Sequence, residues 1–217
     1  MSSSTAGGGP STNTAITALP PIADPAPLGL AAFALTTFLF SAANAKWTHG
    51  TSAWLGYAFA YGGLVQLLAG MWEFRNRNVF GATAFSSYGG FWIGAGLYVE
   101  LVAPTAKSAF EVGNDLAWIS LAFLIFNTYM LLWSATLNLA VFGVFLTLEV
   151  TELILAIGNF DHTGANIVKV GGYIGIVTAA VAWYTSAAGV INGMSAQSGG
   201  RPILYVGAPL IKLGPRS

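Results

Sequence analysis

Cysteine is missing from this sequence of 217 residues, and charged residues are scarce. The absence of cysteine excludes disulfide bonds, thiolate metal sites and cysteine nucleophiles. Charged residues make up 7% of the chain, against roughly 25% in ordinary soluble proteins. The eight basic residues balance the eight acidic ones without forming a basic run, so nucleic acid is not an expected partner. So few charges cannot cover a soluble surface, whereas a surface that faces lipid needs no such cover.

Hydrophobic residues are abundant instead, at 55% of the chain with a mean hydropathy of +0.67. They form continuous runs of about the 20 residues that a membrane-spanning helix needs, whereas barrel strands would alternate over about ten residues. Short hinges separate the runs. We therefore predict an all-α integral membrane protein, embedded in the lipid bilayer, with six transmembrane helices at Leu28–Ala45, Ala53–Trp72, Ala82–Val102, Leu116–Trp133, Leu137–Ile157 and Ile167–Ile191.

The two ends of the chain are predicted to be tails. Residues 1–23 are rich in Ser, Thr, Gly, Ala and Pro, which favours disorder, and they contain no Lys or Arg, unlike a secretory signal. The transmembrane domain then covers 24–195, and 196–217 form a C-terminal tail. Six spans place both ends on one side of a multi-pass protein. The positive-inside rule predicts that this side is the cytoplasmic face of a plasma or inner membrane, because it carries Arg75, Arg77, Arg201, Lys212 and Arg216.

Polar residues with helical spacing occur in several predicted spans. Thr37, Ser41 and Asn44 fall on one stripe of the first span. Taken singly, such a residue either hydrogen-bonds a neighbouring helix or lines a cavity. Stripes on several spans together favour a shared polar path. The candidate path residues are Thr36, Thr37, Ser41, Asn44, Gln66, Ser87 and Asn127.

Two acidic residues, Glu149 and Glu152, fall inside the fifth predicted span, about one turn apart. Carboxyl groups within a membrane are costly and usually functional, so both are candidates for handling a proton. Alternatively, the span is shifted and Glu152 lies near the interface, or both residues contact another subunit. No Lys or Arg lies in the middle of a span, so an anion inside would have no full countercharge.

The sequence does not predict an enzyme. His49 and His162 are isolated, which does not make a metal site. The chain has no phosphate-binding loop, dinucleotide fingerprint or nucleophile elbow. We therefore expect no catalytic residue, no metal and no cofactor.

The segment before the first span is Asp24-Pro25-Ala26-Pro27-Leu28-Gly29-Leu30. By itself it is an ordinary helix start, since Asp caps helices and Pro fits the first turn. Four further motifs follow in order: Tyr61-Gly62-Gly63-Leu64-Val65-Gln66, Ser87-Tyr88-Gly89-Gly90-Phe91-Trp92, Ala156-Ile157-Gly158-Asn159 and Gly171-Gly172-Tyr173-Ile174-Gly175. Together they resemble the acetate uptake transporter family, which includes the bacterial succinate–acetate permease and fungal ammonia/acetate export proteins. The family hallmark has Asn where this chain has Asp24.

The resemblance implies six helices around a narrow pore in each protomer, a homo-hexameric ring, and passage of acetate or, in some members, succinate. It also implies an apolar and aromatic pore constriction, here formed by Phe33, Tyr88 and Leu148. If Leu148 faces the pore, Glu152 lies one turn further on the same face, and Glu149 points about a quarter turn aside. Glu152 is then the favoured residue for proton handling.

Three functions stay open at this point. The resemblance favours transport of acetate and related small monocarboxylates, as an anion channel or a proton-coupled transporter. One alternative is a channel for a small neutral solute such as ammonia or water. The other is a membrane protein that senses acetate without transporting it, which the polar stripes and constriction residues argue against.

Overall fold

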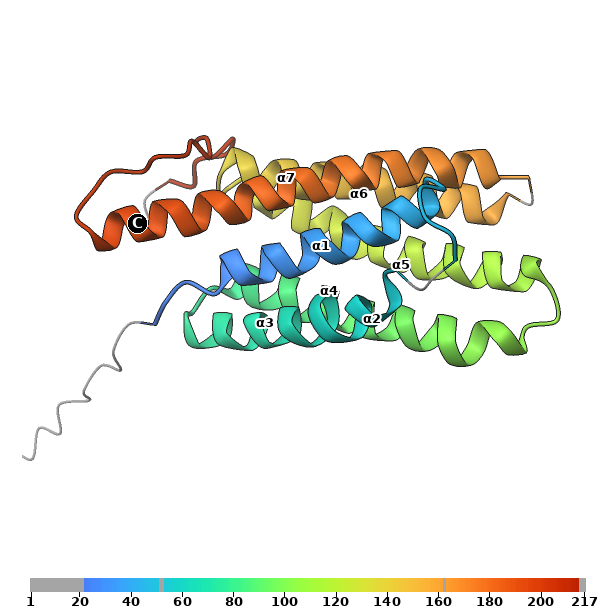
Figure 1. Ribbon diagram of the computed structural model, residues 1–217. Coiled ribbons are helices and arrows are strands. Elements are labelled where there is room, and N and C mark those ends of the chain that lie inside the picture. The colour runs from blue at the N-terminus through green and yellow to red at the C-terminus, as the bar shows by residue number, and fades with distance from the viewer. Residues whose placement is uncertain (1–21, 51–52, 162, 215–217) are drawn as a thin grey trace, which may run out of the picture.

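The computed structural model describes residues 22–50, 53–161 and 163–214. Most of the predicted N-terminal tail, and His162, lie outside these ranges. Within these ranges the chain folds into a bundle of helices that share one axis and alternate in direction (Figure 1). The first helix starts, and the described C-terminal segment finishes, at the same end of the bundle.

Among the described residues, four helices are long and apolar enough to cross a membrane: α1 (Ala26–Asn44), α5 (Ala109–Ser134), α6 (Leu139–Phe160) and α7 (Ala165–Gln197). They cover the first, fourth, fifth and sixth predicted spans. The helix α5 begins well before the predicted start at Leu116. Its early start is explained by a cap, in which Ser108 Oγ accepts a hydrogen bond from Glu111 N at 3.2 Å while the Glu111 carboxylate accepts one from Lys107 N at 2.8 Å.

The second predicted span is covered by a composite helix. It consists of α2 (Leu55–Phe59), a π-helical segment (Ala60–Val65) and α3 (Gln66–Arg75), which follow one another directly. The π-helical segment contains the Tyr-Gly-Gly motif. Such segments are rare and are frequently found at functional sites.

The third predicted span is covered by α4 (Val79–Leu97), which continues into a π-helical segment (Tyr98–Val102) and a 3-10 turn (Ala103–Thr105). The helix starts at a cap, where Asn78 Oδ1 accepts a hydrogen bond from Gly81 N at 3.1 Å.

The helix α1 holds the bundle together, because it packs against α7 on one side and against α3 and α4 on the other. The helix α6 packs between α5 and α7, and α3 packs against α4. Large apolar residues on the outer face of α5 remain exposed, among them Trp118, Ile125, Leu132 and Trp133. Such a face suits contact with lipid or with another subunit.

The motif at residues 24–30 fixes the start of α1 against its neighbours. The Phe85 ring lies so close to Gly29 that an added Cβ would sit 2.7 Å from it, which explains the glycine. Ser186 Oγ on α7 donates a hydrogen bond to Pro27 O at 2.6 Å. Asp24 Oδ1 accepts one from Ala26 N at 2.9 Å, and an asparagine Oδ1 would accept it equally well. The exchange of Asn for Asp at this position therefore keeps the local hydrogen bond.

Two pairs of glycines, Gly90 with Gly94 and Gly171 with Gly175, have the four-residue spacing that allows helices to approach closely, and they have different surroundings. Gly171 contacts Leu155 and Gly175 contacts Ser41, so this pair serves packing within the protomer. Gly90 and Gly94 have no atom within 4 Å of an added Cβ among the described residues, so their surface is open.

The predicted C-terminal tail lies folded along the bundle over residues 198–214. Val206 O accepts a hydrogen bond from Ala140 N, and Ala135 O accepts one from Ile211 N, both at 2.9 Å. Asn192 on α7 donates to Leu204 O and accepts from Ile203 N and Leu204 N. These bonds hold the segment against the start of α6 and the C-terminal part of α7.

Candidate functional site

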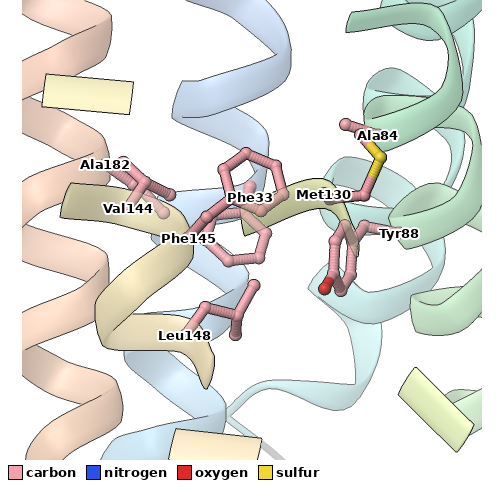
Figure 2. Packing of buried hydrophobic residues seen from close by; sticks show 9 residues of the cluster. Phe33, Ala84, Tyr88, Met130, Val144, Phe145, Leu148 and Ala182 are labelled. Atoms are coloured by element: carbon pink, nitrogen blue, oxygen red, sulfur yellow. The ribbon is translucent and has the colours of Figure 1, made fainter. Parts of the chain in front are cut away.

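Three helices meet at the middle of the bundle through Phe33 on α1, Tyr88 on α4 and Leu148 on α6. All three side chains are buried in one apolar cluster (Figure 2). The rings of Phe33 and Tyr88 meet edge to face, with centroids 5.7 Å apart. The structure therefore brings together the three residues that the family resemblance singles out.

A cavity of about 20 Å³ lies among these residues. This volume is close to the room that one water molecule needs. Its wall consists of Leu30, Phe33, Gln66, Ala84, Phe85, Tyr88, Val144, Phe145 and Leu148. The wall contains no Lys, Arg, Asp or Glu, and its only amide side chain is that of Gln66. Gln66 Oε1 is buried and has no hydrogen-bond partner among the described residues.

Larger cavities lie on both sides of this small cavity. The first, of about 520 Å³, is lined by residues that include Asn44, Lys46, His49, Glu152 and Asn159. The second, of about 310 Å³, is lined at the other end of the bundle by Asp24, Pro27, Leu30, Asn138, Val141 and Val206, among others. The C-terminal segment therefore contributes Val206 to the wall of this second cavity.

The residues along α6 show the order in which the three cavities lie. Val141 lines the smaller end cavity, Val144 and Leu148 line the constriction, and Glu152 lines the larger cavity. The helix α1 passes the same places in the same order, from Pro27 through Phe33 to Asn44. The arrangement is a wide–narrow–wide series along the bundle axis.

A further groove of about 520 Å³ opens sideways between α4 and α5. Its lining is mostly apolar and comprises Ser87, Gly90, Phe91, Gly94, Ala95, Ile119, Ala122, Phe123 and Phe126. The open surface over Gly90 and Gly94 belongs to this groove. The rings of Phe123 and Phe126 separate it from Tyr88, with centroids 5.7 and 5.5 Å from that of Tyr88.

The Tyr88 hydroxyl connects the constriction to a buried polar network. It lies 3.2 Å from Glu152 Oε1 and 3.0 Å from Asn127 Oδ1, within hydrogen-bond distance of both. Glu152 is only 7% exposed, and its Oε2 has no hydrogen-bond partner among the described residues. Glu152 thus contacts Tyr88, which lines the small cavity, and itself lines the larger cavity.

Glu149 has different surroundings from those of Glu152. Its carboxylate accepts hydrogen bonds from Asn127 Nδ2 at 2.6 Å and from Thr128 Oγ1 at 2.7 Å. Both donors lie on α5, and Thr128 is exposed at the outer surface. Glu149 therefore joins α6 to α5 through Asn127 and Thr128.

The other predicted path residues fall into two groups. Asn44 lines the larger cavity, and Gln66 lines the constriction. Thr36 packs against Gly62 with its hydroxyl 3.5 Å from Tyr57 O, and Ser41 packs against Gly175, so both contact neighbouring helices. Thr37 Oγ1 is buried and has no hydrogen-bond partner among the described residues. Ser87 lines the sideways groove, and Asn127 stands behind Tyr88.

Sequence reasoning missed the burial of Glu73, which is completely inaccessible to solvent near the end of α3. Glu73 Oε2 accepts a hydrogen bond from Asn76 Nδ2 at 3.1 Å, and an added Cβ on Gly81 would meet Oε1 at 2.8 Å. The available signal was the helical face that Glu73 shares with Gln66. Val144 and Phe145 were also missed, although they lie one turn before Leu148. The described residues contain no group of three His, Asp or Glu that would hold a metal.

Comparison with known proteins gives the chain relatives over most of its length. A model of the GPR1/FUN34/yaaH family matches residues 7–197. Acetate permease A of Emericella nidulans is 40% identical over 186 residues, which are 78% of this chain and 62% of the permease. The succinate-acetate/proton symporter SatP of Escherichia coli is 35% identical over 199 residues, covering 86% of this chain and 96% of the symporter.

A solved structure is also similar. The structure of the bacterial acetate channel SatP matches with a TM-score of 0.77 and 31% sequence identity, covering 86% of this chain and 100% of that one. The chain spans about 62% of the length of the fungal permease, so the permease contains sequence with no counterpart in the alignment. The four long apolar helices and these relatives show a membrane protein.

Proposed function

Because this chain belongs to the GPR1/FUN34/yaaH family, we propose that it carries acetate and related small monocarboxylates across a membrane, through a pore inside each protomer. The relatives named for acetate transport support the substrate class. The observation that carries the proposal is the series of cavities, about 310, 20 and 520 Å³ in volume, along the bundle axis. Phe33, Tyr88 and Leu148 form its constriction.

The membrane arrangement that we propose has six spans, with the composite helices as the second and third. Both ends of the chain then face the cytoplasm, on the side that carries Arg75, Arg77, Arg201 and Lys212. We further propose a ring of six copies. The exposed apolar face of α5 supports a contact with lipid or with a neighbouring copy.

The chemistry of the constriction favours a small substrate that does not cross as a bare anion. Moving a carboxylate from water into a medium of low dielectric costs on the order of 20 kcal/mol of free energy by the idealised Born estimate. The lining of the constriction offers no cation to offset this cost. Glu152, at the edge of the larger cavity, is positioned to give the carboxylate a proton or to move a proton with it. Acetic acid without its charge fits the narrow apolar neck better than a doubly charged anion does.

Uptake of labelled acetate into proteoliposomes, with and without an imposed proton gradient, tests the proposal. Accumulation that needs the gradient and exceeds the level in protein-free liposomes indicates proton coupling. Protein-dependent equilibration that ignores the gradient indicates a channel. Uptake equal to that of protein-free liposomes under both conditions would reject acetate transport.

A pair of leucine variants tests the pore itself. Leu148→Ala removes bulk from the neck, and we expect uptake of longer monocarboxylates such as butyrate to rise relative to acetate. Leu146→Ala is the matched control, because Leu146 lies on the same helix but is 43% exposed on its outer face. An equal change in both variants, or no change in either, would argue against a neck at Leu148.

A further inference from the structure

The Tyr88 hydroxyl has two acceptors in reach but a single proton to donate. The identity of the Asn127 atom that faces it follows from the other contacts of this side chain. Asn127 Nδ2 donates to Phe145 O at 3.0 Å and to Glu149 Oε2, and both of these partners are acceptors. The amide nitrogen must therefore face them, and Oδ1 faces Tyr88. Asn127 cannot rotate its amide without losing both bonds.

This geometry allows two hydrogen-bond arrangements around Tyr88, and the protonation of Glu152 selects between them. When Glu152 is ionised it can only accept, so the Tyr88 hydroxyl donates to Glu152 Oε1 and leaves Asn127 Oδ1 without its donor. When Glu152 carries a proton, its carboxyl group donates to the Tyr88 oxygen, and the Tyr88 hydroxyl is free to donate to Asn127 Oδ1. A continuous chain of hydrogen bonds then runs from Glu152 through Tyr88 and Asn127 to Glu149.

The direction of this hydrogen-bond chain assigns different protonation states to Glu149 and Glu152. Glu149 receives two hydrogen bonds from Asn127 Nδ2 and Thr128 Oγ1, and both bonds favour a carboxylate. Within the part of the chain that the structure describes, the Glu152 carboxyl group has a single hydrogen-bond partner, the Tyr88 hydroxyl, which can accept as well as donate. Its second oxygen is buried with no partner among the described residues. The exchangeable proton therefore belongs on Glu152.

We propose that Asn127 is a positioning residue that makes the Tyr88 hydroxyl a switch governed by the proton on Glu152. With the proton bound, the Tyr88 hydroxyl turns to Asn127, and the larger cavity meets a neutral carboxyl group next to the neck. With the proton lost, the hydroxyl turns to Glu152, whose negative charge then faces an approaching carboxylate. The use of the switch in transport rests on the proposed function, whereas the switch itself rests on the geometry alone.

The groups that face Glu152 and Tyr88 from the surrounding elements leave this assignment in place. The titratable neighbour of Glu152 on its own helix is Glu149, and Tyr129 on α5 lies near Tyr88. Lys46 and His49 line the same large cavity as Glu152 and are exposed. The helix α1 has no titratable residue between Ala26 and Asn44. From α7 a hydroxyl approaches α6 nearby, where Thr178 Oγ1 lies 3.1 Å from Thr151 Oγ1.

The switch can be tested by infrared difference spectroscopy on the full-length protein in liposomes, titrated without any acetate. A protonated carboxyl group has a C=O stretching band of its own, and the band missing in Glu152→Gln belongs to Glu152. Tyr88→Phe removes a charge-assisted bond from ionised Glu152 and a weaker neutral bond from protonated Glu152, so the midpoint should rise by about one pH unit. Asn127→Leu removes the acceptor that stabilises the protonated arrangement, so the midpoint should fall by about half to one unit.

A double variant separates the switch from a merely structural role. In the Tyr88→Phe background there is no hydroxyl to redirect, so adding Asn127→Leu should move the midpoint by less than about 0.3 unit. Thr128→Val is the control, because it removes a donor to Glu149 without touching Tyr88 and should leave the midpoint of Glu152 unchanged. If Asn127→Leu fails to fold, the upward shift required of Tyr88→Phe decides the matter.

Three results would overturn the switch. They are shifts of the same sign in Tyr88→Phe and Asn127→Leu, an Asn127→Leu effect of equal size in both backgrounds, and the absence of any titrating band that depends on Glu152. These outcomes do not depend on acetate. A protein that titrates as expected but does not take up acetate would leave the switch standing and reject the proposed function. A protein that takes up acetate but gives one of the three contrary results would reject the switch and leave the proposed function standing.

Discussion

The contact between Gly29 and the Phe85 ring makes a quantitative prediction about how α1 is positioned. In Gly29→Ala the added Cβ would lie 2.7 Å from two atoms of the Phe85 ring and 2.8 Å from a third, whereas ordinary carbon contacts are about 3.5–4.0 Å. The ring is buried, so α1 or α4 must move by about 1 Å to relieve the contact. Overpacking of this kind destabilises a protein by roughly 1–3 kcal/mol.

Gly90→Ala is the matched control for this prediction. It makes the same change inside a helix, but no described atom lies within 4 Å of the added Cβ. We expect the thermal unfolding midpoint of purified Gly29→Ala to fall below that of Gly90→Ala, by roughly 2–4 °C for each kcal/mol. Because Phe33 follows Gly29 by about one helical turn, acetate uptake should fall as well.

The double variant Gly29→Ala with Phe85→Leu completes the test. A smaller side chain at position 85 removes the obstacle, so the penalty of Gly29→Ala should be much smaller in the Phe85→Leu background than in the wild type. If Gly29→Ala is as stable as Gly90→Ala, or if Phe85→Leu gives no relief, the explanation of this glycine by close packing is wrong.

Three other predictions follow from single contacts. Ser186→Ala removes the 2.6 Å hydrogen bond to Pro27 O and should destabilise the protein by about 1 kcal/mol, measured as a lower unfolding midpoint, whereas an unchanged midpoint would show that the bond is dispensable. Ser108→Ala removes the cap of α5 and should cost about 1 kcal/mol, with Ser198→Ala, whose hydroxyl lies beyond the end of α7, as the milder control. Since the chain lacks cysteine, Lys46→Cys and Arg77→Cys should react with an impermeant thiol reagent from opposite sides of the membrane, and labelling of both from the same side would contradict the six-span arrangement.

Local sequence predicted the membrane character of the chain and the approximate positions of its helices. Both depend on composition and on the length of apolar runs, which are properties of neighbouring residues. Helix ends were predicted less well, because caps such as that of Ser108 and Glu111 start a helix among polar residues, before the apolar run begins. The close approach at Gly29, within a motif that first looked like an ordinary helix start, depends on a side chain of another helix.

Only the tertiary structure decided what each polar residue faces. Helical periodicity relates residues such as Ser41 and Asn44 to one another on α1, but it does not state how that helix is rotated against its neighbours. In the structure Ser41 packs on Gly175 while Asn44 lines a cavity. The same holds for Glu149 and Glu152, which lie less than one turn apart on one helix. The two carboxyl groups have different partners because α4 contributes Tyr88 and α5 contributes Asn127 and Thr128.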